Sequence, residues 1–531
     1  MPEASLLHEL ILCSAERDPN AAALTYGADT LCYAALADAV RGCANGLLEM
    51  DVKRADRVAV LLEKRFETVV TCFGSAAAGA VFVPINPLLK PEQVAYILRD
   101  CGVGVLVTSR ERLALLEPVL ADCPDLRHLV LVDASTAAPA AREHRSWSDL
   151  LAAPPRAPHR IIDDDLLAIL YTSGSTGLPK GVVLSHRNMV VGAKSVASYL
   201  ENQASDTLLA ALPLSFDAGF SQLTTAFHAG ARVVLLNYLL PRDVLKAMEL
   251  AKVTGLTAVP PLYMQLVALD WPDAIDKHLR YFANTGGRMP KETLLALRRR
   301  VPSAKPFLMY GLTEAFRSTY LPPDEVGRRP DSIGKAIPNA EILVLRDDGT
   351  ECAPDEPGEL VHRGALVGQG YWGDAEKTAE RYKPLPPGLG SRPVSLQLHE
   401  IAVFSGDTVR RDVDGFLYFV GRRDEMMKTS GYRVSPTEVE EVLYATRLIG
   451  ECAAFGVDDE QLGQAIQVVA TPPPGAMEID LPQLLAECRR RMPAYMVPAR
   501  VLSHPGPLPR NPNGKIDRKL LALQWNEQAS V

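Results

Sequence analysis

The amino-acid sequence predicts an α/β protein with a large N-terminal part and a small α+β unit at its C-terminal end. Three observations carry this prediction. Short apolar runs alternate with helical patterns through the first part, as in a parallel sheet with crossover helices. Short strands separated by turns follow near residues 342–345 and 358–363, which indicates antiparallel pairing. After residue 421 the pattern restarts with strands and amphipathic helices.

The strands of the predicted parallel sheets are short apolar runs that lack polar alternation. Runs of this kind suit strands that are buried on both faces, because crossover helices cover both sides of a parallel sheet. The stretches between them read as helices, for example residues 65–78. The strands are predicted at residues 58–62, 103–108, 129–132, 167–171, 207–212, 231–236 and 307–310.

The last part of the sequence predicts a hairpin and then a compact α+β unit. A turn at residues 412–415 separates two short strand patterns, which predicts a β-hairpin. Ser435 is well placed to cap a helix over the residues that follow it. The predicted elements of this unit are a helix at 436–445, strands at 449–455 and 465–471, and a helix at 481–491.

Composition indicates a large globular protein and excludes several function classes. The chain has 531 residues with 56 Lys+Arg against 64 Asp+Glu, a net charge of −8. This balance argues against a nucleic-acid groove or an anionic membrane surface as the main partner. The nine cysteines are scattered and form no C-x-x-C pair, and the N-terminal residues do not resemble a signal peptide. We therefore expect a cytoplasmic protein with reduced thiols and no membrane-spanning helix.

The clearest local signature is a loop of small and hydrogen-bond-donating residues after the strand at 167–171. Its glycines free the backbone to point several N–H groups at one anion, and its hydroxyls and lysine add further donors. This composition predicts a polyphosphate site. It is not a Walker loop, because Lys180 is followed by Gly181 and the glycine spacing differs. The residues concerned are Thr172, Ser173, Gly174, Ser175, Thr176, Gly177 and Lys180.

This loop resembles the phosphate-binding signature of the adenylate-forming superfamily, which includes acyl-CoA synthetases, peptide-synthetase adenylation domains and luciferases. Further motifs agree in order and spacing over nearly the whole chain. The resemblance implies a two-step reaction in which a carboxylate attacks the α-phosphate of ATP and a thiol then displaces AMP. It implies an N-terminal core at 1–421, built of αβ-layered subdomains and a distorted β-barrel. A small mobile lid at 425–531 follows.

A second signature of the superfamily is similar to residues 309–314 of this sequence. The resemblance implies that Tyr310 stacks on adenine with Gly311 beside it, and that Thr313 contacts the α-phosphate. It implies Glu314 as the ligand of Mg²⁺, and a carboxylate at a strand end is a suitable hard ligand for this ion. Gly287 is expected among the nucleotide-binding residues as well.

Three later motifs complete the resemblance. Asp407, in Ser-Gly-Asp, resembles the ribose-binding aspartate, and a carboxylate can accept from both ribose hydroxyls. Arg422 resembles a nucleotide contact. Asp424 corresponds to the hinge about which the lid turns between the half-reactions, and Gly431 would then leave room for a pantetheine arm. Lys515 resembles the catalytic lysine that binds both the substrate carboxylate and the α-phosphate.

The acid that is activated is indicated by Asp217, which follows Phe216. The resemblance to amino-acid-activating members implies that this aspartate pairs with a substrate ammonium, since a buried carboxylate is costly without a partner. The alternative is that Asp217 caps the helix that follows. The match is incomplete, because those members commonly have serine where Gly219 stands. Ser221, Tyr263 and Gly286 are expected to line the same pocket.

Two subgroups of the superfamily remain as alternatives. Residues 310–320 resemble stand-alone ligases that load proline on a carrier protein for pyrrole biosynthesis, and also acyl-CoA ligases associated with exosortase systems. Asp217 favours the first, whereas the sequence from residue 384 onward is equally similar to the second. No stretch resembles a carrier-protein or condensation domain, so the thiol is expected on a separate carrier protein or on CoA. A third alternative, a catalytically silent nucleotide-binding regulator, is disfavoured because the key residues are present.

Overall fold

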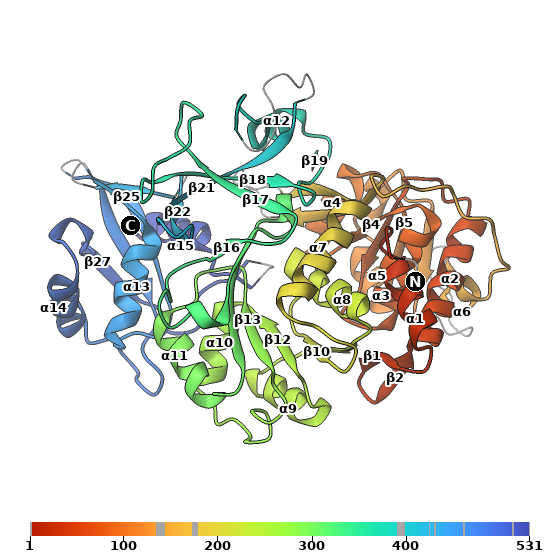
Figure 1. The fold of residues 1–531 in the computed structure, drawn as a ribbon, viewed down its shortest axis with the longest axis horizontal. Coiled ribbons are helices and arrows are strands. Elements are labelled where there is room, and N and C mark those ends of the chain that lie inside the picture. The colour runs from red at the N-terminus through yellow and green to blue at the C-terminus, as the bar shows by residue number, and fades with distance from the viewer. Residues whose placement is uncertain are drawn as a thin grey trace.

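The computed structural model describes residues 3–133, 144–172, 179–389, 399–423, 425–429, 432–459, 462–511 and 514–529. Four β-sheets with helices packed on them make up this part of the chain. The N-terminal third and the C-terminal residues lie at opposite ends of the molecule, and the middle of the chain lies between them (Figure 1).

The first large sheet is built mainly from the N-terminal third and has eight strands in the order β19-β9-β8-β4-β3-β5-β6-β7. The six strands from β8 to β7 in this order pair in parallel, whereas β9 and β19 are antiparallel additions at one edge. The parallel sheet predicted from the apolar runs is therefore confirmed. The strands are β3 (Arg57–Leu61), β4 (Val81–Pro84), β5 (Val103–Thr108), β6 (His128–Leu131), β7 (Arg145–Ser146), β8 (Leu166–Thr172), β9 (Lys180–Ser185) and β19 (Gly370–Tyr371).

The second large sheet has nine strands in the order β16-β15-β14-β13-β12-β10-β11-β1-β2. Its central strands, from β14 to β1, are parallel, and the remaining strands pair antiparallel at the two edges. Its strands are β1 (Ala22–Tyr26), β2 (Asp29–Cys32), β10 (Thr207–Ala210), β11 (Arg232–Leu235), β12 (Gly255–Ala258), β13 (Tyr281–Asn284), β14 (Lys305–Tyr310), β15 (Thr319–Leu321) and β16 (Lys335–Ala336).

The third sheet has five strands and is antiparallel throughout. It contains the antiparallel part expected near residues 342–345 and 358–363, and its last two strands in the chain form the predicted hairpin. Its strands are β17 (Ala340–Leu345), β18 (Gly358–Gly364), β20 (Tyr382–Pro384), β21 (Ile401–Arg411) and β22 (Leu417–Arg422).

The fourth sheet is built from the C-terminal residues and has its own apolar core. Ser435 N donates to Glu438 Oε2 at 3.2 Å where the helix predicted at 436–445 begins, and the helix predicted at 481–491 is present with the same bounds. The elements are β23 (Met427–Thr429), β24 (Tyr432–Val434), α13 (Pro436–Thr446), β25 (Cys452–Asp459), β26 (Gly463–Ala470), α14 (Leu481–Arg491), β27 (Arg500–Ser503) and α15 (Arg518–Ala529).

The remaining helices connect and cover the strands of the two large sheets (Figure 1). Their ends follow local chemistry. Ser185 Oγ accepts from Asn188 N at 3.3 Å where α7 begins, and α3 ends at Gly79, whose φ of 80° suits glycine. These helices are α1 (Glu9–Arg17), α2 (Tyr33–Glu49), α3 (Phe66–Ala78), α4 (Pro91–Asp100), α5 (Arg110–Leu116), α6 (Trp147–Leu151), α7 (His186–Tyr199), α8 (Asp217–Ala229), α9 (Pro241–Ala251), α10 (Pro260–Val267), α11 (Lys291–Arg300) and α12 (Ala375–Arg381).

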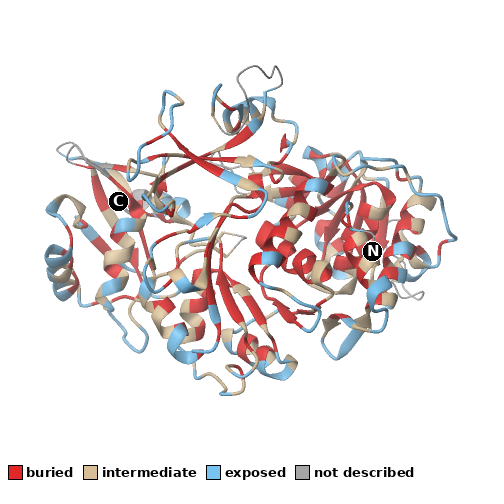
Figure 2. Ribbon diagram, viewed as in Figure 1, coloured by how far each residue is buried: buried red, intermediate tan, exposed pale blue. Residues whose placement is uncertain are grey.

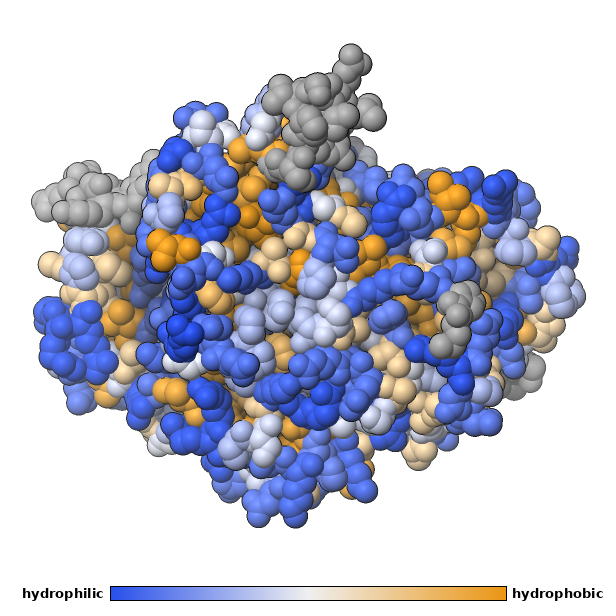
Figure 3. Space-filling model, viewed as in Figure 1, coloured by the Kyte–Doolittle hydropathy of each residue, from blue (hydrophilic) through white to orange (hydrophobic). Residues whose placement is uncertain are grey.

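The main apolar core lies between the two large sheets, where helices α2, α3, α7 and α8 meet. Phe220 of α8 stacks on Phe82 at a ring-centroid distance of 4.9 Å and contacts Phe73. Figure 2 shows buried residues in the strands and on the inner faces of the helices, and the face drawn in Figure 3 is largely hydrophilic. All nine cysteines are free, and Cys13 and Cys32 are the two that are not fully buried. Within the described residues, no helix has the length and apolarity needed to cross a bilayer.

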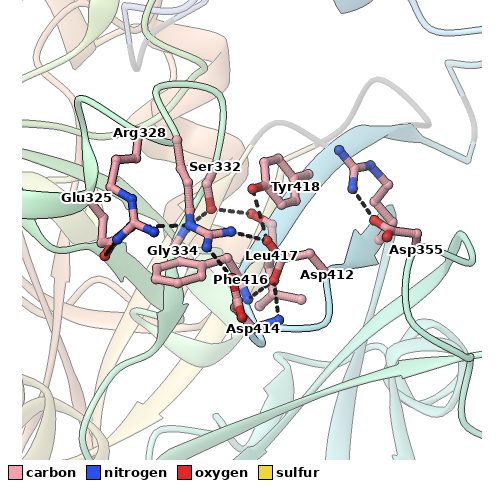
Figure 4. Close-up of polar contacts among 12 residues, drawn as sticks. Glu325, Arg328, Ser332, Gly334, Asp355, Asp412, Asp414, Phe416, Leu417 and Tyr418 are labelled. Carbon is pink, nitrogen blue, oxygen red and sulfur yellow. Dashed lines mark hydrogen bonds and ion pairs between the residues drawn. The ribbon is translucent and has the colours of Figure 1, made fainter.

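An ionic cluster around Arg329 holds the turn of the β21–β22 hairpin. Figure 4 shows the turn residues Asp412, Asp414 and Phe416 beside Glu325. The Arg329 guanidinium donates to Asp412 Oδ2 at 2.5 Å and to Glu325 Oε2 at 3.2 Å, and it also binds Asp414. The same guanidinium lies 4.3 Å from the centre of the Phe416 ring. One side chain thus joins the hairpin turn to the segment before β16.

We expect Arg329→Ala to lower the midpoint of thermal unfolding clearly, because it leaves three carboxylates close together without their shared cation. Arg328→Ala is the matched control, since the Arg328 side chain is 71% exposed and forms one ion pair with Glu325. Differential scanning fluorimetry of both variants measures the difference. Equal midpoints for the two variants would show that the cluster does not hold the hairpin.

Candidate active site

A cleft of about 940 Å³ lies where the carboxyl ends of the parallel strands β12, β13 and β14 meet the third sheet and the C-terminal unit. Ligands of α/β proteins bind at this end of parallel strands. Most of the residues expected from the sequence to form the site line this cleft, although they come from distant parts of the chain. They are Thr172, Lys180, Phe216, Asp217, Gly286, Gly287, Tyr310, Gly311, Thr313, Glu314, Asp407, Arg422 and Lys515.

The second signature, residues 309–314, lies at the cleft, at the end of strand β14 and in the turn that follows it. The strand ends at Tyr310, and a short 3₁₀ turn over Thr313–Ala315 follows it. Tyr371 Oη donates to Glu314 Oε1 at 2.6 Å, which orients the carboxylate that was expected to bind Mg²⁺. Within the described residues, no group of three or more metal-ligating side chains is present. A Mg²⁺ ion held here would therefore depend on phosphate oxygens in addition to Glu314, as is usual for this ion.

Asp407 and Arg422 are partners in the β21–β22 ladder and face the cleft together. Tyr310 Oη donates to Asp407 Oδ2 at 2.5 Å, and Arg422 Nη1 lies 3.8 Å from Asp407 Oδ1. Burial raises the pKa of Asp407, and the arginine opposes this shift. Asp407 Oδ1 is buried and accepts no hydrogen bond from any described residue. The carboxylate therefore keeps one acceptor for a hydroxyl donor, as the predicted ribose contact requires.

Lys515 enters the cleft from a tight loop of the C-terminal unit. Asn511 N donates to Lys515 O at 2.8 Å, and Lys515 N donates to Asn511 Oδ1 at 3.1 Å. The ammonium lies 6.0 Å from the centre of the Phe216 ring. Burial lowers the pKa of Lys515, and the carboxylates of Asp217 and Asp407 oppose this shift. The lysine is therefore placed between the predicted acid pocket and the predicted ribose site.

Gly286 makes room for this lysine. Its φ is +75°, which favours glycine, and a Cβ at this position would lie 3.2 Å from Lys515 Cε. A side chain at position 286 would therefore press on the lysine stem. The position that was expected to line the acid pocket also sets how closely the C-terminal loop approaches β13.

Asp217 is the first residue of α8, and Phe216 is the N-cap, so the aspartate does not occupy the capping position. Its side chain is buried, and Arg317 Nη1 lies 3.8 Å from its Oδ2. Burial raises the pKa of Asp217, and Arg317 opposes this shift. Asp217 Oδ1 accepts no hydrogen bond from any described residue. The carboxylate thus faces the cleft with one oxygen available, although an arginine is close to the other.

Thr172 and Lys180 flank the glycine-rich loop at the ends of β8 and β9. The Lys180 ammonium lies 5.2 Å from the centre of the Tyr371 ring. Burial lowers the pKa of Lys180, and the nearby cations Lys377 and Arg381 lower it further. Several positive charges therefore meet at this end of the cleft. The central loop residues Ser173, Gly174, Ser175, Thr176 and Gly177 lie outside the described residues.

Two of the expected substrate residues are placed elsewhere. Tyr263 is fully buried, and its hydroxyl donates to the backbone carbonyls of Leu256 at 3.0 Å and Ala283 at 2.9 Å. It supports β12 and β13 from behind the cleft. Ser221 lines a separate small cavity behind the cleft wall. The predicted hinge Asp424 and the predicted pantetheine contact Gly431 lie outside the described residues.

The structure adds three side chains that the motifs did not single out. Tyr371 holds Glu314, Arg381 lines the cleft and donates to Phe404 O at 3.3 Å, and Arg317 is buried beside Asp217. Arg317 had a signal in the sequence, because it is a lone charge among small and apolar residues after Glu314. Tyr371 and Arg381 had none, since their partners are distant in the chain.

Comparison with known proteins matches two parts of the chain to related family models. The model of the AMP-binding enzyme family matches residues 13–372, and that of the AMP-binding enzyme C-terminal domain matches residues 438–515. The chain is 30% identical to L-proline--[L-prolyl-carrier protein] ligase of Pseudomonas fluorescens over 98% of this chain and 99% of that protein. It is also 30% identical to a linear gramicidin synthase protein of Brevibacillus parabrevis, over 96% of this chain and only 6% of that much longer protein.

Among solved structures, the anthranilate CoA ligase AuaEII in complex with anthranoyl-AMP superposes with a TM-score of 0.89 at 25% identity. The match covers 100% of this chain and 99% of the ligase. The resemblance inferred from the motifs is thereby confirmed for the family and for the fold. The chain belongs to the family of AMP-binding enzymes.

Proposed function

We propose that the protein activates an amino acid as its aminoacyl-AMP, with release of pyrophosphate, and then transfers it to the phosphopantetheine thiol of a separate carrier protein. Proline is the candidate that similarity to the carrier-protein ligase favours. The proposal places this reaction in the cytoplasm, where ATP is abundant. It includes neither a nucleic-acid nor a membrane partner.

The observation that carries the proposal is the placement of Asp217. A buried carboxylate with an unused oxygen lies in the same cleft as Lys515. A substrate that offers a carboxylate to Lys515 and an ammonium to Asp217 would satisfy both charges. An acid without an amine would leave Asp217 Oδ1 unpaired.

ATP would be held by residues from four elements. Asp407 would accept from the ribose hydroxyls, Tyr310 would contact the base, and Lys180 and Arg422 would bind phosphate oxygens. Mg²⁺ held by Glu314 would neutralise charge on the phosphates. Lys515 would draw the substrate carboxylate and the α-phosphate together, which offsets their mutual repulsion before the bond forms.

We further propose that residues 425–531 move relative to residues 1–421 between the two half-reactions, with Asp424 as the hinge. The position of Lys515 in the cleft supports assigning the present arrangement to adenylate formation. Arg288 binds Glu441 at 2.8 Å and Asp331 at 3.2 Å, and this cluster joins the two parts. After the movement, Gly431 would line the path of the pantetheine arm.

The second candidate is an AMP-forming acyl-CoA ligase, and Arg317 favours it. Because Arg317 lies 3.8 Å from Asp217, the two charges balance without a substrate ammonium. The structural similarity to a CoA ligase supports the same alternative. Such an enzyme would use CoA in place of a carrier protein.

ATP–pyrophosphate exchange with a panel of acids tests the proposal. We expect exchange with amino acids and little exchange with matched acids that lack the amine. Exchange confined to acids without an amine would refute the amino-acid proposal. Consumption of CoA in the absence of any carrier protein would assign the acyl-CoA ligase instead.

A further inference from the structure

Three buried polar atoms at or near the wall of the acid pocket have no hydrogen-bond partner among the described residues. They are Asp217 Oδ1, Arg317 Nε and Gln222 Oε1. The three residues are 3%, 2% and 6% exposed. Most buried polar atoms in folded proteins are paired, because an unpaired one has lost its hydrogen bonds to water. Asp217 and Arg317 also line the cleft, so their unpaired atoms are placed beside the space that a substrate would occupy.

Arg317 forms part of the wall between two spaces. It lines the main cleft, and it also lines a cavity of about 20 Å³ whose other polar residues are Ser221, Gln222, Thr225, Thr257 and Tyr281. A cavity of this size holds about one water molecule. Arg317 is 2% exposed, so it borders the cleft on one side and the small cavity on the other without being open to solvent.

The contacts of Arg317 do not satisfy it. Nη1 donates to Thr285 Oγ1 at 3.1 Å, and the same atom is 3.8 Å from Asp217 Oδ2, which is too long for a hydrogen bond. Bringing a guanidinium and a carboxylate into a protein interior at such a distance gains little stability. The burial of Arg317 and Asp217 is explained if each of the two side chains binds a different part of the substrate.

The charges around the pocket define which substrate this would be. Lys515 and Arg317 are positive and Asp217 is negative. The main-chain groups of an amino acid would pair its carboxylate with Lys515 and its ammonium with Asp217, which leaves Arg317 without an opposite charge. A second carboxylate, on the side chain of the substrate, would supply the opposite charge for Arg317, since guanidinium groups bind carboxylates well.

We propose that the pocket selects an amino acid with a short acidic side chain, and that Arg317 determines this specificity by binding the side-chain carboxylate. The inference rests on the proposed function, that an amino acid is adenylated. The separation of 3.8 Å between Arg317 and Asp217 favours an aspartate-sized substrate, whose ammonium and side-chain carboxylate are close together. Proline, which similarity favours, offers nothing to Arg317.

Four acids of similar size separate the two requirements in one exchange assay. L-aspartate has both the amine and the second carboxylate, L-2-aminobutyrate has only the amine, succinate has only the second carboxylate, and butyrate has neither. Proline is the fifth substrate. We expect kcat/KM for aspartate to exceed that for 2-aminobutyrate and proline by at least about 100-fold, as for pockets built around a polar group.

Variants at Arg317 link the preference to this side chain. Arg317→Met keeps most of the volume and removes the charge, so the ratio of kcat/KM for aspartate over 2-aminobutyrate should approach one. Arg317→Lys should restore part of the ratio. Thr285→Val removes the hydroxyl that holds Nη1 and should weaken the preference less, through KM. It serves as the second variant if Arg317→Met does not fold.

The outcomes distinguish the inference from the proposed function. Wild-type preference for proline or 2-aminobutyrate over aspartate would overturn the inference and leave amino-acid activation standing. Preference for succinate over aspartate would overturn amino-acid activation while keeping Arg317 as a carboxylate-binding residue. Preference for butyrate would overturn both. A ratio unchanged in Arg317→Met would also overturn the inference.

Discussion

Replacing Lys515 with alanine is expected to lower the rate of adenylate formation by at least about 100-fold, a loss typical for a group that stabilises transition-state charge. Its ammonium lies in the cleft that also holds Asp217 and Asp407, and burial strengthens its electrostatic effect. Without it, the substrate carboxylate and the α-phosphate repel each other with no cation between them. ATP–pyrophosphate exchange measures this step directly.

Lys246→Ala is the matched control, because Lys246 is exposed on α9 and does not line the cleft. Thiol transfer from a supplied acyl-adenylate should change little in Lys515→Ala, since the proposed role of Lys515 belongs to the first half-reaction. If Lys515→Ala catalysed exchange at the wild-type rate, the proposed role of Lys515 in adenylate formation would be refuted. An equal loss in both half-reactions would indicate a disturbed C-terminal unit instead.

The parts of the site that could be predicted from the sequence are those carried by short local motifs. Tyr310, Thr313 and Glu314 stand within one strand end and the turn that follows it, so one motif places all three. Lys515 lies in a loop whose own hydrogen bonds to Asn511 set its shape. The geometry of such segments depends mainly on residues that are close together in the chain, so a local sequence pattern is enough to identify them.

The parts that could not be predicted depend on pairings between distant segments. Strands β1 and β2 leave the N-terminal third and join the second sheet, where β1 pairs with β11. Apolar runs predict that strands exist, but they do not predict which run lies beside which. The position of Arg317 beside Asp217 could not be predicted for the same reason. It depends on the packing of α8 against the segment that follows β14.

For Tyr263, in contrast, the sequence predicted a site residue that the structure places outside the site. It was expected in the acid pocket, whereas its hydroxyl is used by two backbone carbonyls behind the sheet. A tyrosine on a helix after a strand suits both positions in the sequence. The choice depends on which face of α10 meets β12 and β13, and this is a property of the packed structure.

Gly219→Ser is expected to destabilise the protein by about 3 kcal/mol, near the upper end of the cost of overpacking a core. A Cβ at position 219 would lie 1.8 Å from Pro213 O and 2.6 Å from Pro213 C. Both atoms belong to the backbone of the turn that Phe216 N closes by donating to Pro213 O at 3.2 Å. The first turn of α8 and the segment before it must therefore separate to admit a side chain. Urea unfolding followed by tryptophan fluorescence measures the loss.

Gly327→Ser is the matched control, since a Cβ at Gly327 would meet no atom within 4 Å. The effect of Gly219→Ser should extend to the acid pocket, because Asp217 lies in the same helical turn and its distance to Arg317 depends on that turn. The resemblance to amino-acid-activating members implied serine at position 219, and the close contact with Pro213 gives this chain a packing reason for glycine. If Gly219→Ser unfolds at the same urea concentration as Gly327→Ser, packing does not explain the glycine. The residue would then have to be explained by the substrate that α8 helps to enclose.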